Sequence, residues 1–66
     1  MVVATRETGR RTILGTDWAV ENFVERRQEF GKVYWLAVFG LCNGVPDRSE
    51  RFATKKAALE AAGIDS

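Results

Sequence analysis

Apolar side chains recur every three or four residues between positions 17 and 30, a spacing that predicts an amphipathic helix. The apolar arc of this helix contains Ala19, Val20, Phe23, Val24 and Phe30. Thr16 or Asp17 would cap its first amides, and Gly31 stands where a left-handed C-terminal cap belongs. As a strand, the same window would mix polar and apolar side chains on each face, so the pattern favours a helix.

The segment that follows predicts a strand. Residues 33–41, Val-Tyr-Trp-Leu-Ala-Val-Phe-Gly-Leu, are rich in β-branched and aromatic side chains. Both alternating sets of side chains are apolar, so we expect a central strand that is covered on both faces. Asn43-Gly44 predicts a tight turn after this strand. Because Pro46 cannot donate to a β ladder, we expect the return strand at about 48–53, at an edge of the sheet.

The first residues of the chain predict a hairpin. Residues 2–6 and 11–14 are β-prone, and they flank a loop at 7–10 in which Gly9 would allow a turn. Residues 2–6 could equally form a frayed terminus.

The last residues predict a second helix and complete the expected fold. The Ala-rich segment 54–62 would be capped by Thr54 and ended by Gly63. We therefore expect a single α+β domain over residues 1–66, with two helices and a small antiparallel sheet of three to four strands. The expected order is ββαββα, or αββα if the first hairpin does not form.

The composition restricts how so small a domain is stabilised. A chain of 66 residues buries roughly 60% of its unfolded surface, and such domains often depend on disulfides, a metal or a partner chain. One cysteine excludes an intramolecular disulfide, and without histidine the usual four-ligand zinc site cannot be built. Association with another chain is therefore the remaining way to stabilise so small a domain.

Targeting signals are not evident in the sequence. The apolar run at 33–41 is too short to cross a bilayer, and the first residues lack the charged start and long apolar stretch of a signal peptide. With a lone thiol and no export signal, we expect a cytoplasmic protein that makes no use of membranes.

The side chains needed for catalysis are scarce. The chain has no histidine, and Cys42 has no evident activating base. Glu21, Glu25 and Glu29 recur every four residues, which is typical of a solvated helix face. The glycines match no phosphate-binding loop. We therefore expect no enzyme activity, no cofactor, no metal site and no small-molecule substrate.

The leading functional prediction is a small protein–protein interaction module, acting as a homo-oligomer, an adaptor or an inhibitor of a larger protein. The large apolar groups exceed what two short helices would cover, and aromatic residues are favoured interface anchors. Arg27 falls within the apolar arc of the first helix, where its stem could cross the core or its charge could face a partner. The candidate partner-binding residues are Trp18, Arg27, Tyr34, Trp35, Leu36 and Phe39.

The alternative prediction is a DNA-binding accessory module. Net charge is +1 and is evenly spread, whereas dedicated nucleic-acid binders usually carry a strong basic excess. Local basic clusters could still contact phosphates, and those in the first turn of the second helix would have free amides beside them. The candidate residues are Arg10, Arg11, Arg48, Arg51, Lys55 and Lys56.

Residues 51–62, Arg-Phe-Ala-Thr-Lys-Lys-Ala-Ala-Leu-Glu-Ala-Ala, resemble the last strand and helix of the arm-type DNA-binding domain of tyrosine integrases. The resemblance implies a three-stranded sheet followed by a helix, with polar and basic strand residues that read the major groove. Here the preceding strand, 33–41, carries no charge, so no functional residue is carried over from that family.

Overall fold

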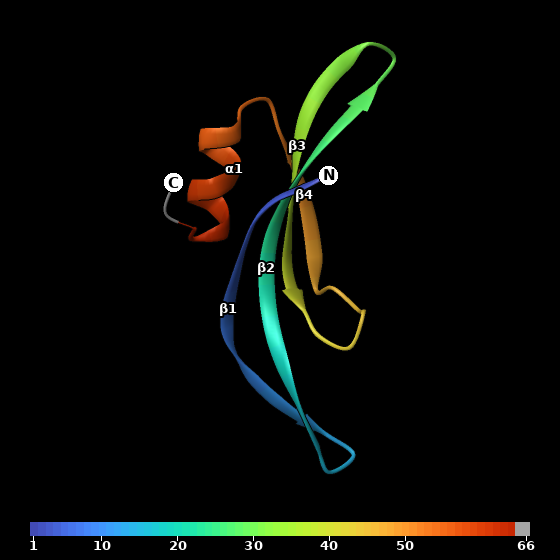
Figure 1. The fold of residues 1–66 in the computed structure, drawn as a ribbon, viewed down its shortest axis with the longest axis vertical. Coiled ribbons are helices and arrows are strands. Elements are labelled where there is room, and N and C mark those ends of the chain that lie inside the picture. The colour runs from blue at the N-terminus through green and yellow to red at the C-terminus, as the bar shows by residue number, and fades with distance from the viewer. Residues whose placement is uncertain (65–66) are drawn as a thin grey trace.

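The computed structural model describes residues 1–64, which form a four-stranded antiparallel sheet and one short helix. The strands lie in chain order, and the helix packs against one face of the sheet (Figure 1). The molecule is elongated, with extents of 44 × 24 × 16 Å. Its elements are β1 (Val2–Ile13), β2 (Thr16–Glu29), β3 (Lys32–Leu41), β4 (Arg48–Phe52) and α1 (Lys55–Ala62).

Two-residue turns connect β1 to β2 and β2 to β3, and a third lies within the longer β3–β4 connection, between the bridged residues Cys42 and Val45. Leu14-Gly15, Phe30-Gly31 and Asn43-Gly44 all have positive φ at both residues, as in the type I′ turns that suit β-hairpins. The first two turns lie at opposite ends of the long axis, because β2 runs nearly the whole length of the molecule (Figure 1). A glycine at the second position of each turn accepts the left-handed conformation without strain.

The predicted helix over 17–30 is wrong, because this segment is strand β2. Its apolar residues satisfy both periods: Val20 and Val24 lie on one face of the strand, and Phe23 on the other. A strand over this segment places polar residues on both of its faces, and each of them has a suitable environment in the structure. Asn22 is held by two hydrogen bonds, while Glu25 lies on the face opposite α1. Pairing with β1 and β3 on both sides outweighs the local helical pattern.

The predicted first hairpin is also wrong. Residues 2–13 form one continuous strand that pairs with β2 through the turn at Leu14-Gly15. Gly9 follows a shift in the β1–β2 register after Glu7, so the irregularity at this site is a bulge within the strand rather than a turn. The order over residues 1–64 is therefore ββββα with one helix, instead of ββαββα or αββα with two.

The other predicted elements are confirmed. The strand expected at 33–41 is β3, and the return strand expected at about 48–53 is β4, at the edge of the sheet. The final helix is α1: the Thr54 side chain accepts a hydrogen bond from the Ala57 amide, and Gly63 ends the helix in the left-handed conformation. Within residues 1–64, no helix is both long and apolar enough to span a bilayer.

The core lies between α1 and one face of the sheet. Small side chains at Ala37, Ala58 and Ala62 allow the helix to approach the strands closely. The buried residues of the core are Val24, Ala37, Phe39, Ala58, Leu59 and Ala62. In residues 1–64 the one helix covers a single face of β3, so no helix lies over the second apolar face of this strand.

Asn22 joins the sheet to the end of the helix. Its side-chain oxygen accepts from the Gly40 amide at 3.0 Å, and its side-chain nitrogen donates to the Ala62 carbonyl at 2.9 Å. The β2–β3 register shifts at this point, and Gly40 has a φ of 67° that glycine adopts readily. Arg6, opposite Asn22 on β1, donates to the Gly63 carbonyl. Residues from β1 and β2 therefore satisfy carbonyls that the end of α1 leaves unpaired.

Candidate functional site

The face of the sheet opposite α1 is called here the open face. Val24 and Ala37 pair across β2 and β3 and point toward α1, so their neighbours in each strand point the other way. Most of the large apolar side chains on the open face form a strip down its centre. The apolar strip consists of Phe23, Tyr34, Leu36, Val38 and Leu41. Val38 is buried to 6% exposure, and the other four remain partly exposed.

Charged side chains flank the apolar strip at both ends. Toward the Leu14-Gly15 turn lie three acidic residues and one basic residue, here called the acidic end: Glu7, Arg10, Asp17 and Glu21. Toward the Phe30-Gly31 turn lie three basic and two acidic residues, here called the basic end: Glu25, Arg27, Glu29, Lys32 and Arg51. The two ends of the open face therefore carry net charges of opposite sign.

Ion pairs hold several of these side chains in place. Arg10 bonds to Asp17 at 2.7 Å and to Glu7 at 3.3 Å, while Arg27 bonds to Glu25 at 3.2 Å. The hydrogen bond and the charge of Asp17 are the main causes that raise the pKa of the Arg10 guanidinium above its ordinary value. Charged side chains at both ends of the apolar strip therefore contact one another within the folded chain.

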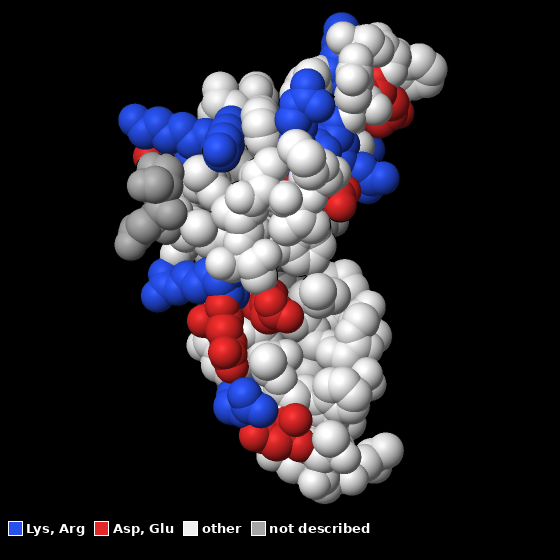
Figure 2. All heavy atoms as spheres, in the orientation of Figure 1, with Lys and Arg blue, Asp and Glu red and all other residues white. Residues whose placement is uncertain are grey.

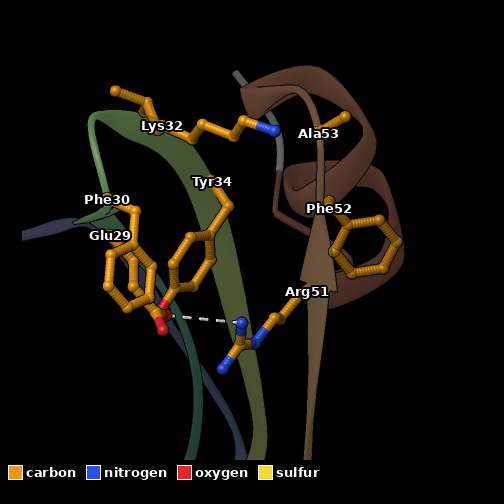
Figure 3. A pocket seen from close by; sticks show the side chains of 8 residues that line it. Glu29, Phe30, Lys32, Tyr34, Arg51, Phe52 and Ala53 are labelled. Atoms are coloured by element: carbon orange, nitrogen blue, oxygen red, sulfur yellow. Dashed lines mark ion pairs between the residues drawn. The ribbon is translucent and has the colours of Figure 1, made fainter.

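A groove lies at the basic end, between the tip of the β2–β3 hairpin and the end of β4 (Figure 3). Its volume is about 540 Å³. Arg51 lies over the Tyr34 ring at 4.6 Å and pairs with Glu29 at 3.5 Å, which fixes one wall. The residues that line the groove are Glu29, Phe30, Lys32, Val33, Tyr34, Arg51, Phe52 and Ala53.

The predicted partner-binding residues divide between the two faces of the sheet. Arg27, Tyr34 and Leu36 come together on the open face, where Arg27 and Tyr34 are cross-strand partners. Trp35 and Phe39 lie on the opposite face, Phe39 within the core and Trp35 packed against it. Trp18 lies opposite Arg11 on the β1–β2 hairpin and is partly buried.

The predicted DNA-binding residues do not gather into one basic surface. Four of them pair with carboxylates: Arg10 as above, Arg11 with Asp47, Arg48 with Glu50, and Arg51 with Glu29. Lys55 and Lys56 are exposed at the start of α1 and form no ion pair within residues 1–64. On the face that Figure 2 shows, basic and acidic side chains alternate along the lower edge and lie intermixed at the upper end.

Two prominent exposed residues, Leu14 and Phe30, are absent from the sites predicted from the sequence. Leu14 is fully exposed, and Phe30 is 95% exposed. The sequence does contain a signal for these turns. A glycine ends each of three segments, at Gly15, Gly31 and Gly44, and three such glycines in succession predict three hairpin turns. Assignment of 17–30 to a helix placed Phe30 in a buried arc and concealed that signal.

Comparison with known proteins finds no matching family model, no matching curated protein and no matching solved structure. In residues 1–64, no three His, Cys, Asp or Glu side chains lie close enough together to hold a metal ion. Any functional assignment therefore depends on the surfaces described above.

Proposed function

We propose that this chain is a non-catalytic protein-interaction module that associates with a second copy of itself through the open face. The observation that carries the proposal is the apolar strip Phe23, Tyr34, Leu36, Val38 and Leu41, which α1 does not cover. An apolar centre within a charged rim is the usual composition of a protein interface. The proposal places the module in the cytoplasm, where its single thiol, the buried Cys42, would stay reduced.

The charge pattern supports a second copy as the partner. Two identical faces pack together about a two-fold axis that lies in the interface. When that axis runs perpendicular to the strands, the basic end of each copy lies over the acidic end of the other. Such a pairing brings net charges of opposite sign together at both ends, which favours association.

The size of the open face also suits a dimer. Specific interfaces bury roughly 800 Å² per partner. The open face follows the 44 Å length of the molecule and is up to four strands wide, about 15–20 Å at the usual strand spacing, so its area is of that order. Aligned sheets pack face to face with their strands within about 30° of each other, which this arrangement allows.

Sedimentation and light scattering over a wide concentration range test the proposal. The wild-type chain should reach twice the monomer mass, and Leu36→Arg, which places a charge in the apolar strip, should remain monomeric. Ala61→Arg on the exposed side of α1 is the matched control and should dimerise like wild type. A wild-type chain that stays monomeric at every concentration would refute the proposal.

A further inference from the structure

Phe30 and Leu14 occupy backbone conformations that bulky side chains avoid. Their φ values are 52° and 50°, in turns whose first position favours Asn, Asp or Gly. The third turn of the same chain has the favoured residue, Asn43, with a φ of 51°. Both apolar side chains point into solvent, so contacts within residues 1–64 do not offset the strain. Strained backbone positions cluster at functional sites.

The middle of β2 lies halfway along the chain between the two strained turns, Leu14-Gly15 and Phe30-Gly31. Leu14 precedes Asn22 by as many residues as Phe30 follows it, and Phe23 on the open face stands beside that midpoint. A two-fold axis across the middle of β2 therefore carries the Leu14 tip of one copy to the Phe30 tip of the other. The tips lie at the two ends of the long axis in Figure 1.

The groove beside Phe30 combines apolar side chains with the charge of Lys32. Phe30 and Tyr34 both line the groove, and Lys32 extends across its upper end toward Ala53 (Figure 3). A volume of about 540 Å³ is in the range of pockets that bind ligands in proteins. Lys32 has no ion-pair partner within residues 1–64, so its charge is available to an incoming carboxylate.

The Leu14 tip presents the complementary groups. Leu14 projects an isobutyl group at the apex, and Asp17 follows on the same hairpin with its side chain exposed. We propose that the groove at the basic end of each copy binds Leu14 of the second copy, with Phe30 against Leu14 and Lys32 facing Asp17. This inference rests on the proposed self-association and adds its two anchor contacts.

Substitution by asparagine tests the anchors without damage to the fold. Leu14→Asn and Phe30→Asn relieve the turn strain, so each variant should resist urea at least as well as wild type. Each should nevertheless weaken self-association about tenfold or more, as expected of interface anchors. Val45→Thr, at an exposed apolar position beside the third turn, is the matched control and should leave the dimer unchanged.

Disulfide trapping tests the contact directly. In a Cys42→Ser background, the double variant Leu14→Cys/Ala53→Cys should form a covalent dimer on mild oxidation, because Ala53 lines the groove. Leu14→Cys alone should not, since the two Leu14 tips lie at opposite ends of the dimer. A wild-type dimer that keeps its affinity in both asparagine variants and gives no trapped dimer overturns this inference and leaves the proposed self-association standing. A wild-type chain that is monomeric overturns both.

Discussion

At the scale of single residues, the three turns share one backbone geometry, but their first residues differ in how readily they adopt a positive φ. Leu14, Phe30 and Asn43 have φ values within 2° of one another, at 50°, 52° and 51°. A side chain with a Cβ costs roughly 1–2 kcal/mol in the left-handed region, and asparagine is among the few that reduce this cost through local hydrogen bonds. The turns therefore provide an internal comparison of turn strain.

The first prediction concerns that comparison. Leu14→Asn should raise the free energy of unfolding by about 0.5–1 kcal/mol, and Asn43→Leu should lower it by a similar amount. Urea unfolding at a concentration where the chain is monomeric measures both changes without the effect of association. Destabilisation by Leu14→Asn would mean that Leu14 makes folded-state contacts that its full exposure does not indicate.

The second prediction concerns Asn22, the polar residue that links the β2–β3 bulge to α1. Asn22→Ala removes the partners of the Gly40 amide and the Ala62 carbonyl in a partly buried region. We expect the free energy of unfolding to fall by about 1–3 kcal/mol, because unpaired buried groups are costly. Gln28→Ala, on the same side of β2 but exposed, should change it by less than about 0.5 kcal/mol. Equal effects of the two substitutions would contradict the role given to Asn22.

At the scale of elements, α1 depends on the sheet for its stability. A helix that spans only Lys55–Ala62 is shorter than the roughly 12 residues that an isolated helix needs. Leu59 is its largest buried side chain, and it packs in the cluster with Val24 and Phe39. The cap at Thr54 sets where the helix begins, but burial of Leu59 holds it on the sheet.

The third prediction follows from that dependence. Leu59→Ala should cost about 2–4 kcal/mol, a large share of the stability available to so small a domain. Thermal unfolding followed by circular dichroism measures the loss, and Glu60→Ala on the exposed side of α1 is the control. A melting temperature that is unchanged in Leu59→Ala would show that α1 contributes little to the stability of the sheet.

The β2 segment shows why element type was hard to derive from residues 17–30. A spacing of four residues returns to the same face of a helix and also to the same face of a strand. Glu21, Glu25 and Glu29 therefore share a face in either structure, and so do Val20 and Val24. The β-branched and aromatic content of the segment favoured a strand, but the apparent caps at Asp17 and Gly31 pointed to a helix.

At the scale of the whole molecule, ion pairs with carboxylates limit how many arginines could bind a nucleic acid. Arg10, Arg11, Arg48 and Arg51 each lie within 4.0 Å of a carboxylate, and the net charge is +1. A nucleic acid would have to compete with those carboxylates for each arginine. Few phosphates could then be neutralised together.

The fourth prediction is that DNA binding is weak and sensitive to salt. Titration of labelled duplex should show affinity only at low ionic strength, with a steep loss as salt is added. Lys55→Ala/Lys56→Ala should remove most of the residual binding, because these two lysines form no ion pair within residues 1–64. Sub-micromolar binding that survives physiological salt and is lost in the double variant would favour the DNA-binding alternative over the protein-interaction module.

The sequence by itself determined the features that depend on neighbouring residues. The Thr54 cap, the Ala-rich body and Gly63 specify α1, and continuous β-branched and aromatic side chains specify the strand at 33–41. Glycine with asparagine specifies the turn at Asn43-Gly44, because few other residues accept that backbone geometry. The local physics of caps, propensity and turns is strong enough in these segments to need no distant contact.

Only the tertiary structure decided the rest. Residues 17–30 became a strand because two neighbouring strands satisfy their backbone groups, an effect that acts between residues far apart in the chain. The same pairing placed Tyr34 and Leu36 on the open face and Phe39 in the core, although all three are apolar members of one run. It also brought Arg51 onto Tyr34 beside Phe30 and so formed the groove. Alternation along a strand separates its two faces, but which of them receives the helix depends on where the remaining chain packs.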